Sequence, residues 1–136
     1  MKTQLIRNVS VALLAATYMF GQDSHRVTAQ IPFGFHVGTS MLPAGQYMVA
    51  ADMRTGTVRL RSDDFKSTVV VLSSLITPGS KSDKNKLVFN RYGDQYFLSQ
   101  IWVEEGVEGR SLRKSKQEIE VASSAPQATR SVMARK

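Results

Sequence analysis

Apolar and polar residues alternate along several short stretches of this chain. In residues 24–31, Val27, Ala29 and Ile31 share one side, and polar residues occupy the other. Residues 57–61 show the same period of two, with Val58 and Leu60 on one side. This alternation is typical of β-strands that turn one face to an interior and the other to water.

Seven such segments are expected, each bounded by Gly, Pro, Asp or Asn. They cover residues 24–31, 33–37, 46–51, 57–61, 68–76, 86–92 and 95–103. Many short strands with frequent turn residues indicate an all-β fold. The sequence therefore predicts a small antiparallel β-sandwich, or a partly open barrel, of about seven short strands.

The hairpin formed by residues 86–92 and 95–103 is the most sharply defined local feature. Gly93-Asp94 lies between the two segments, and a two-residue turn of this kind uses the positive φ that glycine adopts. Large rings are concentrated here: Phe89, Tyr96, Phe97 and Trp102. Because burying such a ring contributes about 2 kcal/mol, the hairpin is expected to organise the core.

The two ends of the chain differ from this central part. Residues 1–8 carry Lys2 and Arg7 without an acid, and an uncharged apolar run follows over residues 9–20. That run is shorter than the ~20 residues of a membrane helix. Residues 1–21 are therefore interpreted as a secretory signal peptide, and residues 22–105 as the β-domain.

Residues 106–136 differ in composition from the predicted β-domain. Residues 111–121 lack Gly and Pro and place Lys114 four residues before Glu118, which favours a short helix. From Ala122 onward the chain has little to bury. This region is predicted to be a weakly helical to disordered basic tail.

Composition narrows the possible partners. The chain of 136 residues has a formal net charge of +7 and no cysteine. It therefore forms no disulfide, and its charge favours acidic partners such as an anionic polymer of the cell envelope. A signal peptide on such a domain predicts export to the periplasm or the extracellular space, with no membrane span after cleavage.

No catalytic or metal-binding pattern emerges. His25 and His36 lie on separate segments without a third defined ligand, so no metal or cofactor is expected. A triad can be drawn on paper from Ser40, His36 and Asp52, but their spacing does not favour it, and no G-x-S-x-G is present. The sequence predicts no catalytic residue.

Basic residues form two clusters. One surrounds the polar loop at residues 77–84, and the other comprises Arg110, Arg113, Lys114 and Lys116. The candidate contacts to an anionic ligand are Arg59, Arg61, Lys81, Lys84 and Lys86. Solvated charge without a dedicated partner is the alternative, and a specific nucleic-acid partner is not expected, because the rings lie on apolar strand faces.

Two short motifs carry a resemblance. The sequence reads I-P-F-G-F-H-V-G at residues 31–38 and L-P-A-G-Q-Y at residues 42–47, and the likeness continues at residues 87–102 and 111–116. It resembles a family of small exported bacterial proteins with the pattern I-P-F-x-F-x-V-G and L-P-A-G-x-Y. The resemblance implies a small extracytoplasmic β-fold and transfers no catalytic residue.

The leading hypothesis is a non-enzymatic extracytoplasmic β-module with a binding or structural role at the cell envelope. Its expected partner is an anionic envelope polymer or another envelope protein. The first alternative is a carbohydrate- or anionic-polymer-binding domain that uses Arg59, Arg61 and the basic loop. The second alternative is a small hydrolase with an unrecognised site, which would need a His, a Ser and an Asp within hydrogen-bond reach.

Overall fold

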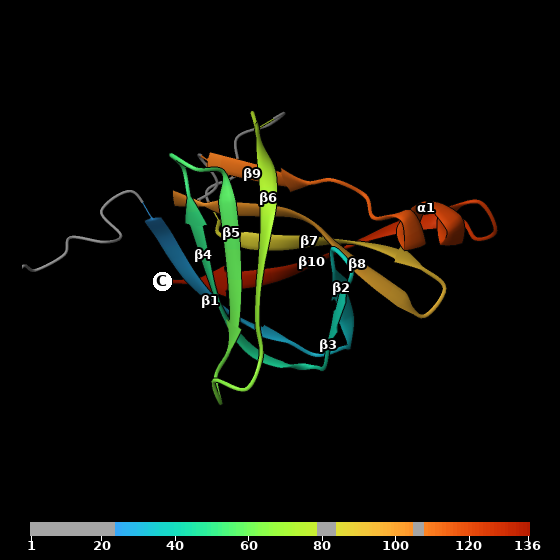
Figure 1. The fold of residues 1–136 in the computed structure, drawn as a ribbon, viewed down its shortest axis with the longest axis horizontal. Helices are drawn as coiled ribbons and strands as arrows, with labels where there is room; N and C mark the ends of the chain where they lie inside the picture. The colour runs from blue at the N-terminus through green and yellow to red at the C-terminus, as the bar shows by residue number, and fades with distance from the viewer. Residues whose placement is uncertain (1–23, 79–83, 105–107) are drawn as a thin grey trace, which may run out of the picture.

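A computed structural model describes residues 24–78, 84–104 and 108–136 of the chain, which contain ten β-strands and one short helix (Figure 1). In chain order the elements are β1 (Ser24–Ile31), β2 (Phe35–Val37), β3 (Ser40–Leu42), β4 (Gly45–Asp52), β5 (Thr57–Ser62), β6 (Thr68–Ile76), β7 (Lys86–Tyr92), β8 (Gln95–Val103), β9 (Glu108–Leu112), α1 (Lys116–Ala122) and β10 (Gln127–Arg135). The predicted signal peptide lies outside the described residues. Among the described residues, no helix has the length and hydropathy needed to span a membrane.

Eight of the strands form a closed antiparallel barrel. Their order is β8–β7–β10–β1–β4–β5–β6–β9, and β9 pairs back onto β8 to complete the circle. In Figure 1, β4, β5 and β6 cross steeply in front of β7, β8 and β10. The hairpin of β2 and β3 lies outside this circle, and β2 runs parallel to β8 where His36 is opposite Phe97.

The all-β class is confirmed, but the expectation of a sandwich or partly open barrel with about seven strands is corrected in two respects. The barrel is closed, and three strands were missed: β3, β9 and β10. The seven expected segments all correspond to strands. The missed strands are either very short or poor in large apolar residues, so alternation does not reveal them.

The predicted disordered tail is wrong. Strand β10 lies between β7 and β1, and it pairs with β7 from Gln127 to Met133. Most of its side chains are exposed, and only Val132 and Ala134 pack partly against the core. Composition suggested disorder because this strand is held mainly by its main chain.

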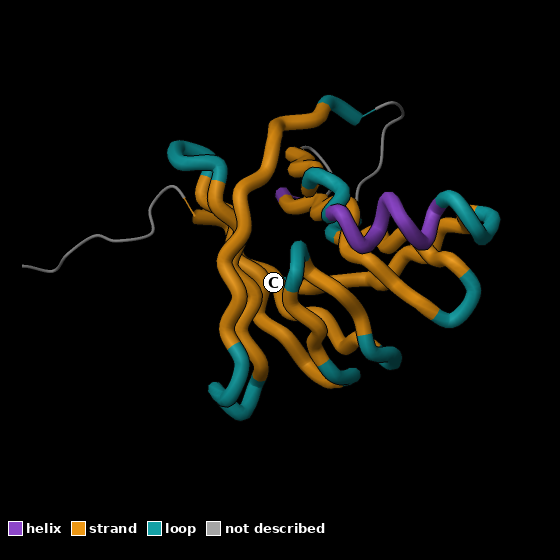
Figure 2. Tube along the Cα trace, turned by 45° about the vertical axis from the view of Figure 1, so that its right-hand side comes forward, coloured by secondary structure: helices purple, strands orange, loops and turns teal. Residues whose placement is uncertain are grey.

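The short helix overlaps the predicted helical region, residues 111–121, but it begins later, at Lys116, and residues 111 and 112 belong to β9. The hydroxyl of Ser115 caps its N-terminus by accepting a hydrogen bond from the Glu118 amide at 3.1 Å. The Glu118 carboxylate is buried, and it accepts hydrogen bonds from Asn90 Nδ2 at 2.9 Å and from the Tyr92 hydroxyl at 3.2 Å. These bonds fix the helix beside the hairpin of β7 and β8, as Figure 2 shows. Burial, with the Glu118 charge second, raises the pKa of Tyr92.

The core fills the inside of the barrel. Phe35 packs edge-to-face against Tyr47 and Phe89, with ring centroids 5.2 and 5.4 Å apart. Of the rings predicted to organise the core from the hairpin, Phe89 belongs to this cluster and Tyr96 packs partly against it, whereas Phe97 and Trp102 are buried outside the cluster. Gly93 has a φ of 64°, which confirms the tight turn expected between β7 and β8.

Candidate anion-binding face

Strands β1 and β5, which lie on either side of β4, place arginine side chains on one outer surface of the barrel. Their inward residues belong to the core, so the residues between them face outward. The register aligns Arg26 of β1 with Ala50 of β4, and Ala50 with Arg59 of β5. Residues aligned across adjacent strands share a face. Arg26 and Arg59 therefore flank Ala50.

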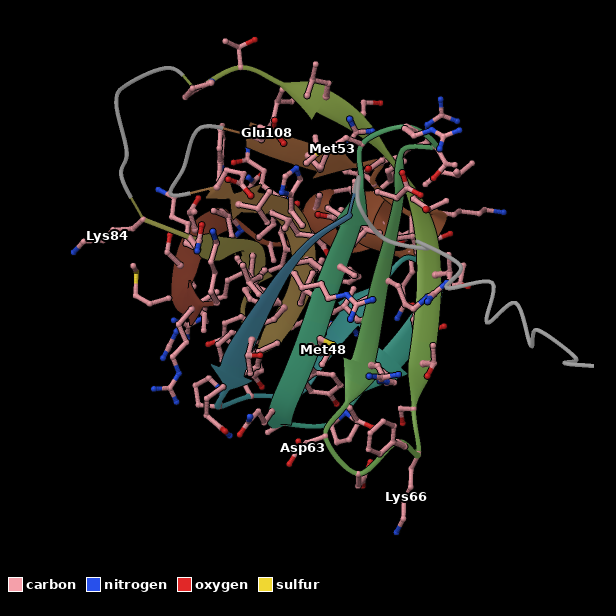
Figure 3. The ribbon with its side chains drawn as sticks, turned by 90° about the vertical axis from the view of Figure 1, so that its left-hand side faces the viewer. Met48, Met53, Asp63, Lys66, Lys84 and Glu108 are labelled. Carbon is pink, nitrogen blue, oxygen red and sulfur yellow. The ribbon has the colours of Figure 1, made fainter. Side chains whose placement is uncertain are left out.

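A second row lies beside the first. Thr28 of β1 is aligned with Met48 of β4, and Met48 with Arg61 of β5. Figure 3 shows Met48 near the middle of this surface. We call Arg26, Arg59 and Arg61 the arginine face. Because strands lie about 4.8 Å apart and rise about 3.4 Å per residue, the three Cα atoms fall within about 10–13 Å.

Arg61 is held by neighbours on this surface. Its Nη2 lies 3.7 Å from Met48 Sδ, and its guanidinium carbon lies 4.6 Å from the centre of the Phe65 ring. The Phe65 side chain is 70% exposed, and its φ of 62° is rare for a residue with a side chain. The strained residue thus presents an aromatic ring to solvent beside a cation.

The turn between β5 and β6 holds Phe65 in this position. The Phe65 amide donates to the Ser62 carbonyl at 3.0 Å. The Asp64 carboxylate accepts bonds from the Ser62 hydroxyl at 2.6 Å and the Lys66 amide at 3.0 Å. These two hydrogen bonds, the hydroxyl first, lower the pKa of Asp64. The Asp64 carboxylate therefore binds groups within the turn and forms no ion pair with the arginines.

No acid in the described residues forms an ion pair with the arginine face. In residues 24–78, 84–104 and 108–136, both ion pairs within 4.0 Å involve His25, so none involves Arg26, Arg59 or Arg61. Asp52, at the end of β4, accepts bonds from the amides of Arg54 and Thr55, which lower its pKa. The face thus presents unpaired positive charge to solvent.

Hollows lined by polar groups adjoin this face. A pocket of about 370 Å³ is lined by residues that include Gln30, Gln46 and Ser62 together with the acids Asp63 and Asp64. A smaller hollow of about 60 Å³ is lined by residues that include Gln46, Met48, Arg61, Phe65 and the acid Asp63. Gln46 lines both, so amide groups that can donate and accept hydrogen bonds adjoin the guanidinium of Arg61.

The structure separates the candidate residues named from the sequence. Arg59 and Arg61 lie next to each other on the outer face of β5, as their spacing predicted. Lys86 begins β7 and Lys84 lies two residues before it, and β7 is four strands from β5 in either direction around the barrel. Figure 3 shows Lys84 at the margin of the molecule, away from Met48. Lys81 is outside the described residues, and the other four do not share one face.

Sequence reasoning missed Arg26 and Phe65 as members of the site. Arg26 was assigned to a polar strand face, but only the register of β1 with β4 shows that it flanks β5. Phe65 did give a signal, because it is a large ring within an otherwise polar turn. The predicted basic cluster of Arg110, Arg113, Lys114 and Lys116 is wrong for Arg110, because this residue is only 6% exposed.

The two histidines occupy different settings. His36 is buried and stacks on Phe97 at a centroid distance of 4.4 Å, and burial lowers its pKa. His25 lies between Glu104 at Nδ1 and Glu108 at Nε2. The two carboxylates approach opposite ring nitrogens, and no group of three His, Asp or Glu side chains in the described part of the chain is arranged to hold a metal ion.

Comparison with protein-family models, with curated proteins and with solved structures found no match to this chain.

Proposed function

We propose that this protein is a non-enzymatic, exported β-barrel module that binds an anionic polysaccharide at the cell envelope through the arginine face. The supporting observation is that two aligned cross-strand rows bring Arg26, Arg59 and Arg61 together without a carboxylate within 4.0 Å of them in the described residues. The basic and apolar residues at the start of the chain support export.

The neighbours of these arginines favour a sugar polymer as the anionic partner. Gln30 and Gln46 supply amide groups that match sugar hydroxyls, and the exposed Phe65 ring supplies an apolar surface on which a sugar ring can stack. The arginines lie on an open strand surface rather than in a deep cavity, which suits a long chain. Guanidinium groups bind carboxylate or sulfate groups through paired hydrogen bonds.

Calorimetric titration with dextran sulfate and with neutral dextran tests this proposal. We expect saturable binding of dextran sulfate only, with an affinity that falls as sodium chloride rises, because exposed charges are screened over about 8–10 Å at moderate salt. Binding that is indifferent to salt, or equal for both polymers, would contradict the proposal.

A pair of double variants separates the arginine face from net charge. Arg59→Ala with Arg61→Ala should weaken dextran sulfate binding at least about tenfold, a loss of about 1.4 kcal/mol. Lys84→Ala with Lys86→Ala removes the same charge from the opposite side of the barrel and should have a much smaller effect. Equal losses in the two double variants would show that only overall charge matters.

A further inference from the structure

A second hollow, separate from the arginine face, lies at the other end of the barrel from the β5–β6 turn. It has a volume of about 380 Å³, which lies within the range of small-molecule sites. It is lined by Met53, Leu75, Ile76, Thr77, Pro78, Glu108 and Arg110. Figure 3 shows Met53 and Glu108 at this end, far from Asp63 in the opposite turn.

Arg110 is built into the wall of this pocket. Its side chain reaches across from β9 to β6, where Nε donates to Ser73 Oγ and Nη2 donates to the Ser73 carbonyl, both at 2.9 Å. Ser73 Oγ in turn donates to the Gly56 carbonyl at 2.7 Å. Gly56 is needed here, because its φ is +75° and a Cβ would lie 2.8 Å from Arg110 Nη2. The guanidinium is therefore held in a fixed position.

This guanidinium has no acidic partner in the described residues, where both ion pairs within 4.0 Å involve His25. A cation that is only 6% exposed carries a large desolvation cost unless an anion accompanies it. Ser73 offers only neutral acceptors and occupies two of the five N–H donors of the guanidinium. An anion that entered the pocket would offset this cost.

Glu108 adds the opposite charge to the same pocket. It precedes Arg110 by two residues on β9, so both side chains emerge from the same face of the strand. Its Oε2 lies 3.3 Å from His25 Nε2, but without hydrogen-bond geometry, and this buried atom has no hydrogen-bond partner. The pocket thus offers a cation and a carboxylate that do not pair with each other, the carboxylate lying within ion-pair distance of His25 instead.

We propose that this pocket binds a small zwitterion, an α-amino acid with an aliphatic side chain. Its carboxylate would pair with Arg110, and its ammonium group with Glu108. Its side chain would lie against the apolar wall formed by Met53, Leu75 and Ile76. This activity is independent of polysaccharide binding, because none of the residues involved belongs to the arginine face.

Calorimetric titration of the chain with three related molecules tests the proposal. L-leucine carries both charges, 4-methylpentanoate lacks the ammonium group, and 3-methylbutylamine lacks the carboxylate. We expect saturable binding of L-leucine, and binding at least about tenfold weaker for each analogue. No saturable heat with L-leucine at millimolar concentration, or equal affinity for 4-methylpentanoate, would overturn the proposal.

Variants assign the contacts. Arg110→Met should abolish L-leucine binding, and Glu108→Gln should reduce it to the level of 4-methylpentanoate.

Because Arg110→Met alters a buried position, Leu75→Asp provides a second test: Leu75 is 67% exposed, so the fold should tolerate the change while the apolar wall is lost. Leu72→Asp, on the same strand and 73% exposed but outside the pocket, is the control and should bind normally. Unchanged binding by Leu75→Asp would overturn the proposal.

Discussion

Strands β8 and β10 both lie within the wall of the barrel, with a neighbour on each side, but different forces hold them. Strand β8 pairs with β7, β9 and β2, and it buries Phe97, Leu98, Ile101, Trp102 and Val103. Strand β10 pairs with β7 and β1, yet none of its side chains is buried.

This difference shows that a strand in a closed barrel does not need apolar side chains to be ordered. The amide of Ala134 in β10 donates to the carbonyl of Asn85 at 3.0 Å, next to the ladder with β7. The main chain of β10 pairs with β7 from Gln127 to Met133 and with β1 at Ala134 and Arg135, whereas β8 also gains the free energy of burying large side chains. We therefore expect side-chain truncation to affect β8 and main-chain disruption to affect β10.

The largest expected effect is on β8. Ile101→Ala removes a fully buried side chain and should lower the free energy of unfolding by about 2–5 kcal/mol. Met133→Ala, at a position of β10 that is 52% exposed, should change it by less than about 0.5 kcal/mol. Urea unfolding followed by circular dichroism measures both. Comparable losses would show that side chains anchor the two strands equally.

The reverse experiment disrupts the main chain of β10. Ala134→Pro removes the hydrogen bond to Asn85 and leaves its carbonyl without this donor, which should lower the free energy of unfolding by about 1–3 kcal/mol. Ala134→Ser keeps the amide and is the control, with a smaller loss. If both variants melted at the same temperature in a thermal scan, the ladder would not be what holds β10.

The same contrast explains which parts of this fold could be predicted from the sequence. Seven strands could be found because their apolar residues either alternate, as in β1 and β5, or form a nearly continuous run, as in β6, and the Gly93 turn could be found because its chemistry is local. Strand β10 was missed because main-chain pairing leaves no pattern in the side chains. The start of the helix does leave a pattern in the side chains, because Ser115 followed three residues later by Glu118 is typical of a helix cap. The Glu118 carboxylate, however, bonds to Asn90 and Tyr92.

The candidate sites follow a similar rule. Arg59 and Arg61 could be paired from sequence, because they are two residues apart on one strand. Arg26 joins them only through the strand order, and the same order sends Lys86 to the opposite side of the barrel. Sequence patterns do not predict the burial of Arg110, because its partner Ser73 lies 37 residues away, a separation that local patterns do not span.

The smallest expected effect concerns pH and the packing of β2 on β8. His36 stacks on Phe97, and burial lowers its pKa below the ordinary value of 6.5. Below pH 6.5 the unfolded chain takes up a proton that the folded chain does not, so the free energy of unfolding should fall as the pH drops. The pKa values of Asp52 and Asp64 are lowered from 3.8, so these groups contribute only in more acidic solution.

Melting temperatures measured between about pH 5 and 8 should show a shallower pH dependence in His36→Gln than in the parent chain, because neutral glutamine takes up no proton. If the melting temperature of His36→Gln depended on pH as steeply as that of the parent chain, His36 would not be the source of the pH dependence. The packing of β2 on β8 would then be as insensitive to pH as the main-chain ladder of β10.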